Sequence, residues 1–477
     1  MRARTRIRTH RRSRNGRGGG GVAVVVHNDP SQAGPVAVVV GLLFGLAGTG
    51  TSAIAVALPM LGADFGVGAS GAAWVVSSYA VALAVMTAVH GRVADIVGIR
   101  LPLVVGVIMM SAGALLATAA PTFGVLVTGR VLQGAGSAAV PVLGTALISA
   151  RWEGATRAGA LGRVAGTAAA LSSLGPLIGG MLVAAGGWRS AMALPVVGLL
   201  ALPVILRVAP AEGTGEGFDL PGAVFVAGAA TGLVLLIQSA SAGAVVAVVG
   251  AGLLVLGIPA VTARIRSRPG GFLPRSVMTN GAVLRSACAA AAIPAGWFAL
   301  LIAVPTVLVG QGWSALGIGF VLVPSAVAAL AMPRITRVVL PRRGAAGSLA
   351  LACPIAVLAL LAATLGAAGG VAALLVVGVM LVTVAFGLGQ PAMVSAVGSA
   401  VTDSQRGVAL GVATLIFLAG AGIGSAVVGG LAESIGVAGA LAVLVTLPVA
   451  GSVTMALQLR VRQQPVAALS AEAAYRP

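Results

Sequence analysis

Charge is scarce in this chain, and lysine is missing altogether. Only 8% of the 477 residues are charged, and all 29 basic residues are arginine. The two cysteines, Cys288 and Cys353, both lie inside apolar runs, so neither a disulfide framework nor a metal site is supported. The sequence also lacks a zinc-binding His-Glu pair, a nucleophile elbow and a phosphate-binding loop. We therefore expect no enzymatic activity, no cofactor and no bound metal.

What the chain has instead is a succession of long hydrophobic runs. Hydrophobic residues make up 58% of the sequence, and the mean hydropathy is +1.08. This composition excludes a water-soluble protein and indicates a polytopic membrane protein. The runs fit helices of roughly 20 residues, and they lack the alternating pattern of a membrane β-barrel. The predicted fold class is therefore all-α.

The runs predict fourteen transmembrane helices separated by short polar loops. Their expected ranges are roughly 36–60, 70–90, 101–119, 122–149, 156–185, 189–207, 219–240, 243–262, 284–309, 315–339, 346–367, 370–399, 406–432 and 436–458. An even number of crossings places both termini on the same side of the membrane.

The net charge of +19 is typical of proteins that bind nucleic acid, but the positions of the arginines argue against that partner. If the N-terminus is cytoplasmic, every arginine except Arg130 and Arg189 falls in a cytoplasmic loop, a tail or an adjoining helix end. This asymmetry follows the positive-inside rule. We therefore expect a multi-pass protein of the cytoplasmic membrane, surrounded by the lipid bilayer, with both termini in the cytoplasm.

An internal repeat divides the predicted helices into two sets. Arg157, Ala160, Leu161, Gly162, Gly175 and Gly180 recur as Arg406, Ala409, Leu410, Gly411, Gly424 and Gly429, at a constant offset of 249. This offset makes the fifth and thirteenth helices equivalent, as expected for two six-helix bundles separated by an inserted helix pair. The expected order is a disordered arginine-rich tail at 1–35, a first bundle at 36–207, a linker with two inserted helices at 208–268, a second bundle at 269–459 and a cytoplasmic tail at 460–477. We expect a monomer.

A charged segment, GRVADIVGIR at 91–100, lies between the second and third helices. Gly91 and Gly98 permit a tight turn, and Asp95 can exchange charged hydrogen bonds with Arg92 and Arg100. Such a clasp can hold one conformation of a moving protein. In residue type and setting, the segment resembles the loop between helices 2 and 3 of the major facilitator superfamily. A bland charged turn is the alternative.

An arginine lies in the middle of the fourth predicted helix, in the segment GRVLQGAGSAAVP. A charged side chain at that depth costs about 2.5–3.5 kcal/mol on insertion scales, so Arg130 should face the protein interior or a wet cavity. Gln133 lies three residues further on the same helix face. We interpret Arg130 as a substrate or coupling residue. The alternative is an arginine that braces the bundle by bonding to backbone carbonyls.

The fifth predicted helix contains Gly166 and ends in LGPLIGG, which includes Gly175, Pro176, Gly179 and Gly180. Proline removes a backbone hydrogen bond and allows a bend, and the glycines give a smooth packing face. This order resembles the antiporter motif of drug exporters. Together with FDLPG at 218–222, it resembles the fourteen-helix drug:proton antiporters, especially tetracycline and multidrug exporters of the Gram-positive type. The likeness implies export of a small molecule by alternating access, coupled to proton influx.

The resemblance implies a central site between the bundles, although the acidic residues of such exporters are missing here. The positions that correspond to those acids hold Gly50 or Thr51, Ser172 and Ala421. The polar candidates for binding or coupling are Thr51, Ser77, Arg130, Gln133, Ser172, Ser173 and Gln390. With no buried acid to pair with a cation, we expect a neutral or anionic amphiphilic drug or antibiotic-like metabolite. The alternatives are an uncoupled or uptake metabolite carrier and a non-transporting membrane sensor.

Overall fold

The computed structural model describes residues 30–213 and 219–474, and in these ranges it contains helices and no strands. The first half comprises α1 (Ala33–Phe65), α2 (Ala69–Val97), α3 (Arg100–Thr118), α4 (Phe123–Ser137), α5 (Ala139–Arg151), α6 (Gly154–Ser173), α7 (Gly175–Ala193), the 3-10 helix η2 (Leu194–Ala201) and α8 (Leu202–Val208). The remainder comprises α9 (Leu220–Ala242), α10 (Ala244–Ser267), α11 (Arg275–Met278), α12 (Gly281–Gly310), α13 (Ala315–Val321), α14 (Val323–Gly369), α15 (Ala372–Gly398), α16 (Asp403–Leu444) and α17 (Thr446–Ala474). The all-α fold class is confirmed.

Eleven helical spans in the described residues are long and apolar enough to cross a membrane. Three of them, of 34, 55 and 56 residues, each contain one internal glycine with a left-handed backbone: Gly187 (φ +71°), Gly344 (φ +68°) and Gly436 (φ +75°). A straight helix of 55 residues would be about 80 Å long, more than twice the thickness of a bilayer core. Each of these spans therefore joins two helices that meet at the glycine. The total of fourteen crossings stays a prediction.

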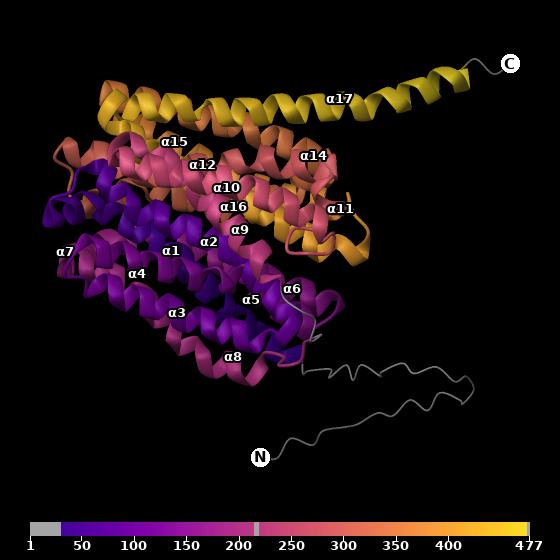
Figure 1. The fold of residues 1–477 in the computed structure, drawn as a ribbon, viewed down its shortest axis with the longest axis horizontal. Coiled ribbons are helices and arrows are strands. Elements are labelled where there is room, and N and C mark those ends of the chain that lie inside the picture. The colour runs from indigo at the N-terminus through magenta and orange to yellow at the C-terminus, as the bar shows by residue number, and fades with distance from the viewer. Residues whose placement is uncertain (1–29, 214–218, 475–477) are drawn as a thin grey trace, which may run out of the picture.

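The helices form two groups, which Figure 1 shows as an indigo and purple half beside an orange and yellow half. At the end of the molecule that carries most arginines, here called the arginine-rich end, each half has its own apolar core, drawn from 33–209 and 277–455 respectively. Toward the opposite end, one continuous core includes residues of both halves, such as Val76, Trp188 and Leu308. The halves therefore share one large core toward one end. At the arginine-rich end their main cores are separate, and a small cluster that includes Val89 of α2 and Leu415 of α16 joins them on the flank of the inserted helices.

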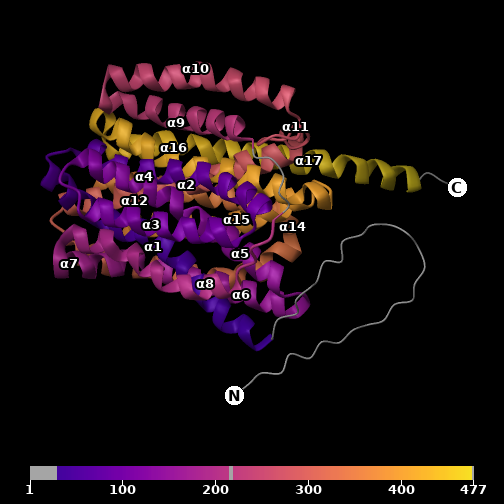
Figure 2. The same cartoon turned by 60° about the horizontal axis from the view of Figure 1, so that its bottom comes forward.

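The inserted helices α9 and α10 lie on one flank of the molecule, and Figure 2 shows them layered over α16. α9 packs against both halves. A Cβ atom on Gly430 of α16 would lie close to the carbonyl of Ile237, and Gln238 Nε2 donates a hydrogen bond to Ser77 Oγ of α2 at 2.5 Å. α10 lies outside α9 and has a largely exposed apolar surface, as Val245 is 77% exposed. α9 thus covers the seam between α2 and α16.

Helices extend into both predicted tails, whose division from the bundles stays a prediction. Residues 1–29 lie outside the described residues, but α1 already begins at Ala33, within the predicted tail 1–35. The last helix does not end near 458, because α17 continues to Ala474 and extends beyond the other helices in Figure 1. The apolar run ends there, but the arginine, glutamine, alanine and leucine residues that follow favour a helix just as well.

Candidate functional site

A cavity lies between the two halves of the molecule. About 510 Å³ of space inside it is free of atoms, including the part that opens to solvent. Its walls come from α1, α6 and α7 of the first half and from α12, α14 and α15 of the second. The lining residues are Ser52, Ala55, Val56, Ser172, Ser173, Pro176, Trp297, Leu300, Leu301, Val304, Pro305, Leu322, Ser325, Val379 and Val382. This position makes the cavity the candidate binding site.

The polar part of the lining consists of four serines and one tryptophan. Two of these five, Ser172 and Ser173, are predicted site residues. Ser52, Trp297 and Ser325 are not among the predicted candidates. A signal for Trp297 exists in the sequence, since it lies in the middle of its apolar run at 284–309 and the other four tryptophans do not. Ser52 follows Thr51 directly, so the rotation of α1 decides which of the two hydroxyls faces the cavity.

Arg130 lies inside the first bundle and not in the cavity. Its side chain is 0% exposed; Nε donates to the Val75 carbonyl at 2.8 Å, and Nη1 donates to Gln133 Oε1 at 2.7 Å. The guanidinium also lies 4.4 Å from the centre of the Tyr79 ring. The guanidinium thus faces the protein interior, one of the two surroundings expected for it, and a role for Arg130 in substrate binding or coupling stays a prediction. The alternative, an arginine that braces α4 against α2 by bonding to backbone, describes the observed contacts.

The other predicted polar residues are placed away from the cavity lining. Gln133 is 1% exposed and Thr51 is 4% exposed, with its hydroxyl buried in the first bundle. Ser77 is fully buried and binds Gln238 of α9. Gln390 is half-buried on α15. Of these residues, Ser77 joins two helices by a hydrogen bond, and a role for any of them in coupling stays a prediction.

The glycines of the antiporter-type motif hold α7 close to its neighbours. Gly175 lies against Ser52 of α1, and a Cβ atom on Gly179 would meet the backbone of Ala53. Gly180 faces the other half, since a Cβ atom there would lie 2.7 Å from the carbonyl oxygen of Ala315. A glycine is therefore needed at Gly179 and Gly180 for close backbone contact and at Gly175 for close contact with the Ser52 side chain. The helix is interrupted at Leu174, directly before the Gly-Pro pair.

Glycines of α6 and α16 near the arginine-rich end are uncovered. A Cβ atom added to Gly159, Gly162 or Gly166 of α6 would meet nothing within 4 Å. The same holds for Gly407 and Gly411 of α16. Gly166 therefore makes no close packing contact, unlike the other glycines of the antiporter-type motif. These uncovered glycines agree with the separate cores at this end.

The segment at 91–100 is mostly helix and not a loop, which corrects the prediction. α2 continues to Val97, so Gly91 lies inside the helix, where a Cβ atom would make ordinary contact with Val142. Within the segment, Gly98 alone has a left-handed backbone, with φ +84°. Arg92 and Asp95 lie one turn apart, with 3.8 Å between Nη1 and Oδ2. This geometry gives a weak, solvent-exposed pair. The role of Asp95 as a conformational clasp stays a prediction.

Two arginines at this end hold the segment that leaves the first bundle. Arg100 Nε donates to the Ala209 carbonyl at 2.9 Å, and Arg151 Nε donates to the Val208 carbonyl at 2.6 Å. These carbonyls are at the end of α8, where helical partners run out and cationic donors are favourable. The predicted partner of Arg100 was Asp95; the observed bond of its Nε is to the backbone of the linker.

Asp219, from the FDLPG motif, is the centre of a polar cluster that ties α9 to α10. Its Oδ1 accepts from Arg264 Nη2 at 2.7 Å and from Nε at 3.0 Å, while Oδ2 accepts from the Phe272 N–H at 2.9 Å. Arg268 lies 3.8 Å away. Burial by itself would raise the pKa of Asp219, but the hydrogen bonds from Arg264, Phe272 and Gly222 outweigh it and hold the pKa below its ordinary value.

The opposite end has its own charged contacts. Asp64 Oδ2 accepts from the indole N–H of Trp188 at 2.6 Å, and Arg189 lies 3.5 Å from the same oxygen. On the second half, Glu433 of α16 approaches the start of α2, since a Cβ atom on Gly68 would lie 2.8 Å from its Oε1. These are contacts at the end where the two halves share one core.

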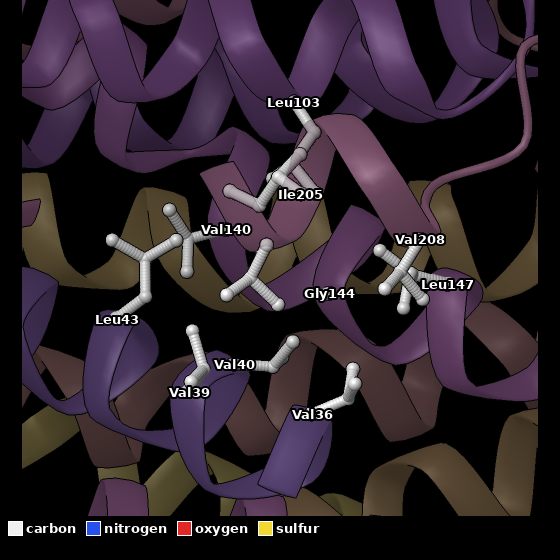
Figure 3. Close-up of a pocket in the computed structure, with 11 residues that line it drawn as sticks. Val36, Val39, Val40, Leu43, Leu103, Val140, Gly144, Leu147, Ile205 and Val208 are labelled. Atoms are coloured by element: carbon white, nitrogen blue, oxygen red, sulfur yellow. The ribbon is translucent and has the colours of Figure 1, made fainter. Parts of the chain in front are cut away.

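A second hollow, inside the first bundle, is entirely aliphatic. Figure 3 shows the side chains of α1, α3, α5 and α8 around it, including Val40, Leu103 and Leu147. Since it offers no polar group to orient a ligand, we assign it to packing. Within the part of the chain that the structure describes, no cluster of three or more His, Cys, Asp or Glu side chains has metal-binding geometry.

Comparison with known proteins agrees with this geometry. Residues 40–395 match the family model described as Major Facilitator Superfamily. The chain is 40% identical over 136 residues to the multidrug resistance protein Stp of Mycobacterium tuberculosis (strain CDC 1551 / Oshkosh), covering 28% of this chain and 25% of that protein. It is 31% identical over 290 residues to the cephamycin export protein CmcT of Amycolatopsis lactamdurans, covering 57% of this chain and 58% of that protein.

These matches span less than two thirds of either relative. A third relative, the puromycin resistance protein pur8 of Streptomyces alboniger, is 32% identical over 196 residues, which cover 39% of this chain and 38% of that protein. Among solved structures, the transporter PepTSo of the POT family has the same fold, with a TM-score of 0.67, 13% identity and coverage of 92% of this chain and 99% of that one. The match over 40–395, more than half of the sequence, shows that this chain belongs to the major facilitator superfamily.

Proposed function

We propose that this protein exports a small amphiphilic drug or antibiotic-like metabolite across the cytoplasmic membrane by alternating access. The observation that carries the proposal is the central cavity, whose walls come from both halves of the molecule. The halves share one core toward one end and have separate cores at the arginine-rich end. A carrier that rocks about a central site needs this arrangement in one of its two states. The names of the relatives, multidrug resistance, cephamycin export and puromycin resistance, support the direction of transport.

The arrangement of arginines supports the orientation in the membrane. In the proposed orientation the arginine-rich end faces the cytoplasm, as do both termini, in agreement with the positive-inside rule. In this orientation the end at which the halves have separate main cores faces the cytoplasm, the side from which an exporter takes up its substrate. The unit is a monomer, because the cavity is complete within one chain.

Coupling to proton influx is the second part of the proposal. The cavity lining contains no acid, so the proton has to be carried elsewhere. Glu433 and Asp95 are suitable positions, since Glu433 approaches the first turn of α2 across the boundary between the halves and Asp95 lies at the arginine-rich end. Substrate movement without any proton movement is the competing mechanism.

The test uses the purified protein in proteoliposomes. We expect a pH gradient, acidic on the side of Glu433, to drive accumulation of puromycin, and to drive less of it in the Glu433→Gln and Asp95→Asn variants. Substrate that equilibrates across the membrane at a rate independent of the pH gradient would exclude proton coupling and indicate facilitated diffusion. Absence of movement for a broad drug panel, together with normal binding, would favour a sensor over an exporter.

A further inference from the structure

The central cavity has no charged group in its lining. Its fifteen lining residues include neither an acid nor a base, and its polar side chains are four serines and Trp297. Arg130, the charged side chain within the first bundle, is fully buried against α2 instead. A carboxylate or ammonium group that enters this cavity would lose water without gaining a counter-charge, which is strongly unfavourable.

Each of the four serine hydroxyls in the lining donates its proton in a hydrogen bond to a backbone carbonyl of the protein. Ser325 donates to the Leu322 carbonyl at 2.6 Å and Ser173 to the Ala170 carbonyl at 3.0 Å. Ser172 donates to the Gly45 carbonyl at 3.1 Å, and Ser52 lies 3.3 Å from the Gly48 carbonyl. A hydroxyl has one proton and two lone pairs, so each serine retains acceptor capacity only. To donate into the cavity, it would first have to give up its bond to a carbonyl.

A backbone carbonyl adds to this set of acceptors. Pro305 lies inside α12 and has no N–H, so the carbonyl of Leu301, four residues earlier, lacks its usual helical partner. Leu301 and Pro305 both line the cavity. The polar groups available to a ligand are therefore mainly acceptors.

Trp297 supplies the one indole of the lining. Its ring offers a flat apolar face, and it lies 5.9 Å from the ring of Phe386, measured between centroids. An indole N–H is a neutral donor, so it can bind one ether or carbonyl oxygen but cannot compensate a full negative charge. The remaining lining residues are aliphatic or proline.

We propose that the cavity binds neutral, largely apolar molecules whose polar groups are mainly hydrogen-bond donors, such as hydroxyl or N–H groups, and that it rejects carboxylates and fixed cations. The inference deepens the proposed function, on which it rests for the identification of the cavity as the transport site. It narrows the expected substrates, because the position of Arg130 removes the reason for expecting an anion.

The test is a binding comparison with four biphenyls that differ in one substituent. Tritiated biphenyl-4-ol is bound to the purified full-length protein in detergent at pH 7, and displacement is measured with unlabelled biphenyl-4-ol, 4-methoxybiphenyl, biphenyl-4-carboxylate and biphenyl-4-yl-trimethylammonium. We expect the methoxy compound to bind about fivefold more weakly than the phenol, which corresponds to one neutral hydrogen bond. The two ions should bind at least about a hundredfold more weakly.

A pair of variants on α14 locates the effect. Ser325→Ala removes a cavity acceptor whose own bond lies within one helical turn, so the fold should persist, and we expect it to weaken binding of biphenyl-4-ol about fivefold without changing that of 4-methoxybiphenyl. Ser348→Ala is the matched control. Ser348 is fully buried in the part of α14 that follows Gly344, donates to the Gly344 carbonyl at 2.8 Å and does not line the cavity, so its removal should leave both affinities unchanged.

Three outcomes would overturn the inference. The first is displacement by the carboxylate or the trimethylammonium compound within tenfold of the phenol, and the second is equal binding of phenol and ether with no effect of Ser325→Ala. The third is the absence of saturable binding for all four compounds. Selective binding of the phenol without any export in proteoliposomes would instead count against the proposed function alone, since the binding measurement requires no transport.

Discussion

Gly180 of α7 and Gly429 of α16 occupy equivalent places in the two halves. Each faces the beginning of a helix from the opposite half: Gly180 lies against Ala315 of α13, and Gly429 lies against Ala73 of α2. The repeat at an offset of 249 residues in the sequence therefore corresponds to a repeat of contacts across the boundary between the halves. These contacts close the molecule at the end opposite the arginines.

Gly180→Ala should impair transport by disturbing this closure. The new Cβ atom would lie 2.7 Å from the Ala315 carbonyl, and overpacking of this kind costs about 1–3 kcal/mol. Because only the closed state is penalised, we expect export to fall at least about fivefold while the protein still inserts and folds. The measurement is export rate per molecule in proteoliposomes. Gly159→Ala is the control, since its Cβ would meet nothing within 4 Å, and equal rates for the two variants would contradict the closure.

Arg130→Ala should lower stability more than substrate affinity. The substitution leaves the Val75 carbonyl and Gln133 Oε1 without their charged donor and opens a cavity between α2 and α4, which together cost about 3 kcal/mol. We expect a clear fall in melting temperature in detergent and unchanged biphenyl-4-ol affinity in the fraction that remains folded. Arg130→Lys should restore little of the lost stability, because an ammonium group lacks the planar, forked set of N–H donors of the guanidinium. A lost affinity at normal melting temperature would place the guanidinium in the binding site after all.

Asp219→Asn should loosen the junction between α9, α10 and the segment that follows. The pKa of Asp219 is held below its ordinary value, so its hydrogen bonds are fully present above about pH 3.9 and are lost only as the pH falls through that lowered pKa. The protection factors of the Phe272 and Gly222 amides, which are corrected for the intrinsic exchange rate, should therefore be the same at pH 6 and pH 8 and should be lower in the variant at both. Hydrogen exchange read by mass spectrometry measures this, with Glu212→Gln in the exposed linker as the control. Protection that survives in Asp219→Asn would show that the carboxylate does not hold the junction.

Gly98→Ala should damage the turn between α2 and α3, and Gly91→Ala should not. Gly98 has φ +84°, and a Cβ atom there would lie 2.6 Å from the carbonyl carbon of Ala211 in the linker. Strain and steric conflict together should destabilise the protein by about 2 kcal/mol. At Gly91 the nearest atom would be 3.6 Å away, which is ordinary contact within a helix. Thermal unfolding of the two variants separates these cases, and a similar loss for both would contradict the described turn.

The sequence allowed prediction of the fold because membrane helices follow from long apolar runs and from the placement of arginine. It also indicated correctly that Arg130 is buried. The direction of that side chain could not be predicted, since a spacing of three residues between Arg130 and Gln133 fits a cavity-facing pair as well as a bracing pair. Only the packing of α4 on α2, through the close approach of Gly134 to the Tyr79 backbone, decides between them.

The cavity itself was predicted only in part for a similar reason. Ser172 and Ser173 were expected because the resemblance to drug exporters places the fifth helix at the central site, but Ser52 and Ser325 depend on the rotation of α1 and α14 about their axes. Rotation is set by contacts with helices far away in the chain, such as Gly175 against Ser52. The extension of α2 to Val97 was missed because charge ended the apolar run, although charged residues continue a helix readily.

The position of α9 over the seam between α2 and α16 has a consequence for the surrounding membrane. On that flank we expect acyl chains to contact α9 and the exposed valines and leucines of α10, and not the joint between the halves. We therefore expect a lipophilic substrate that enters from a leaflet to use the other flank, where α6 lies beside α14.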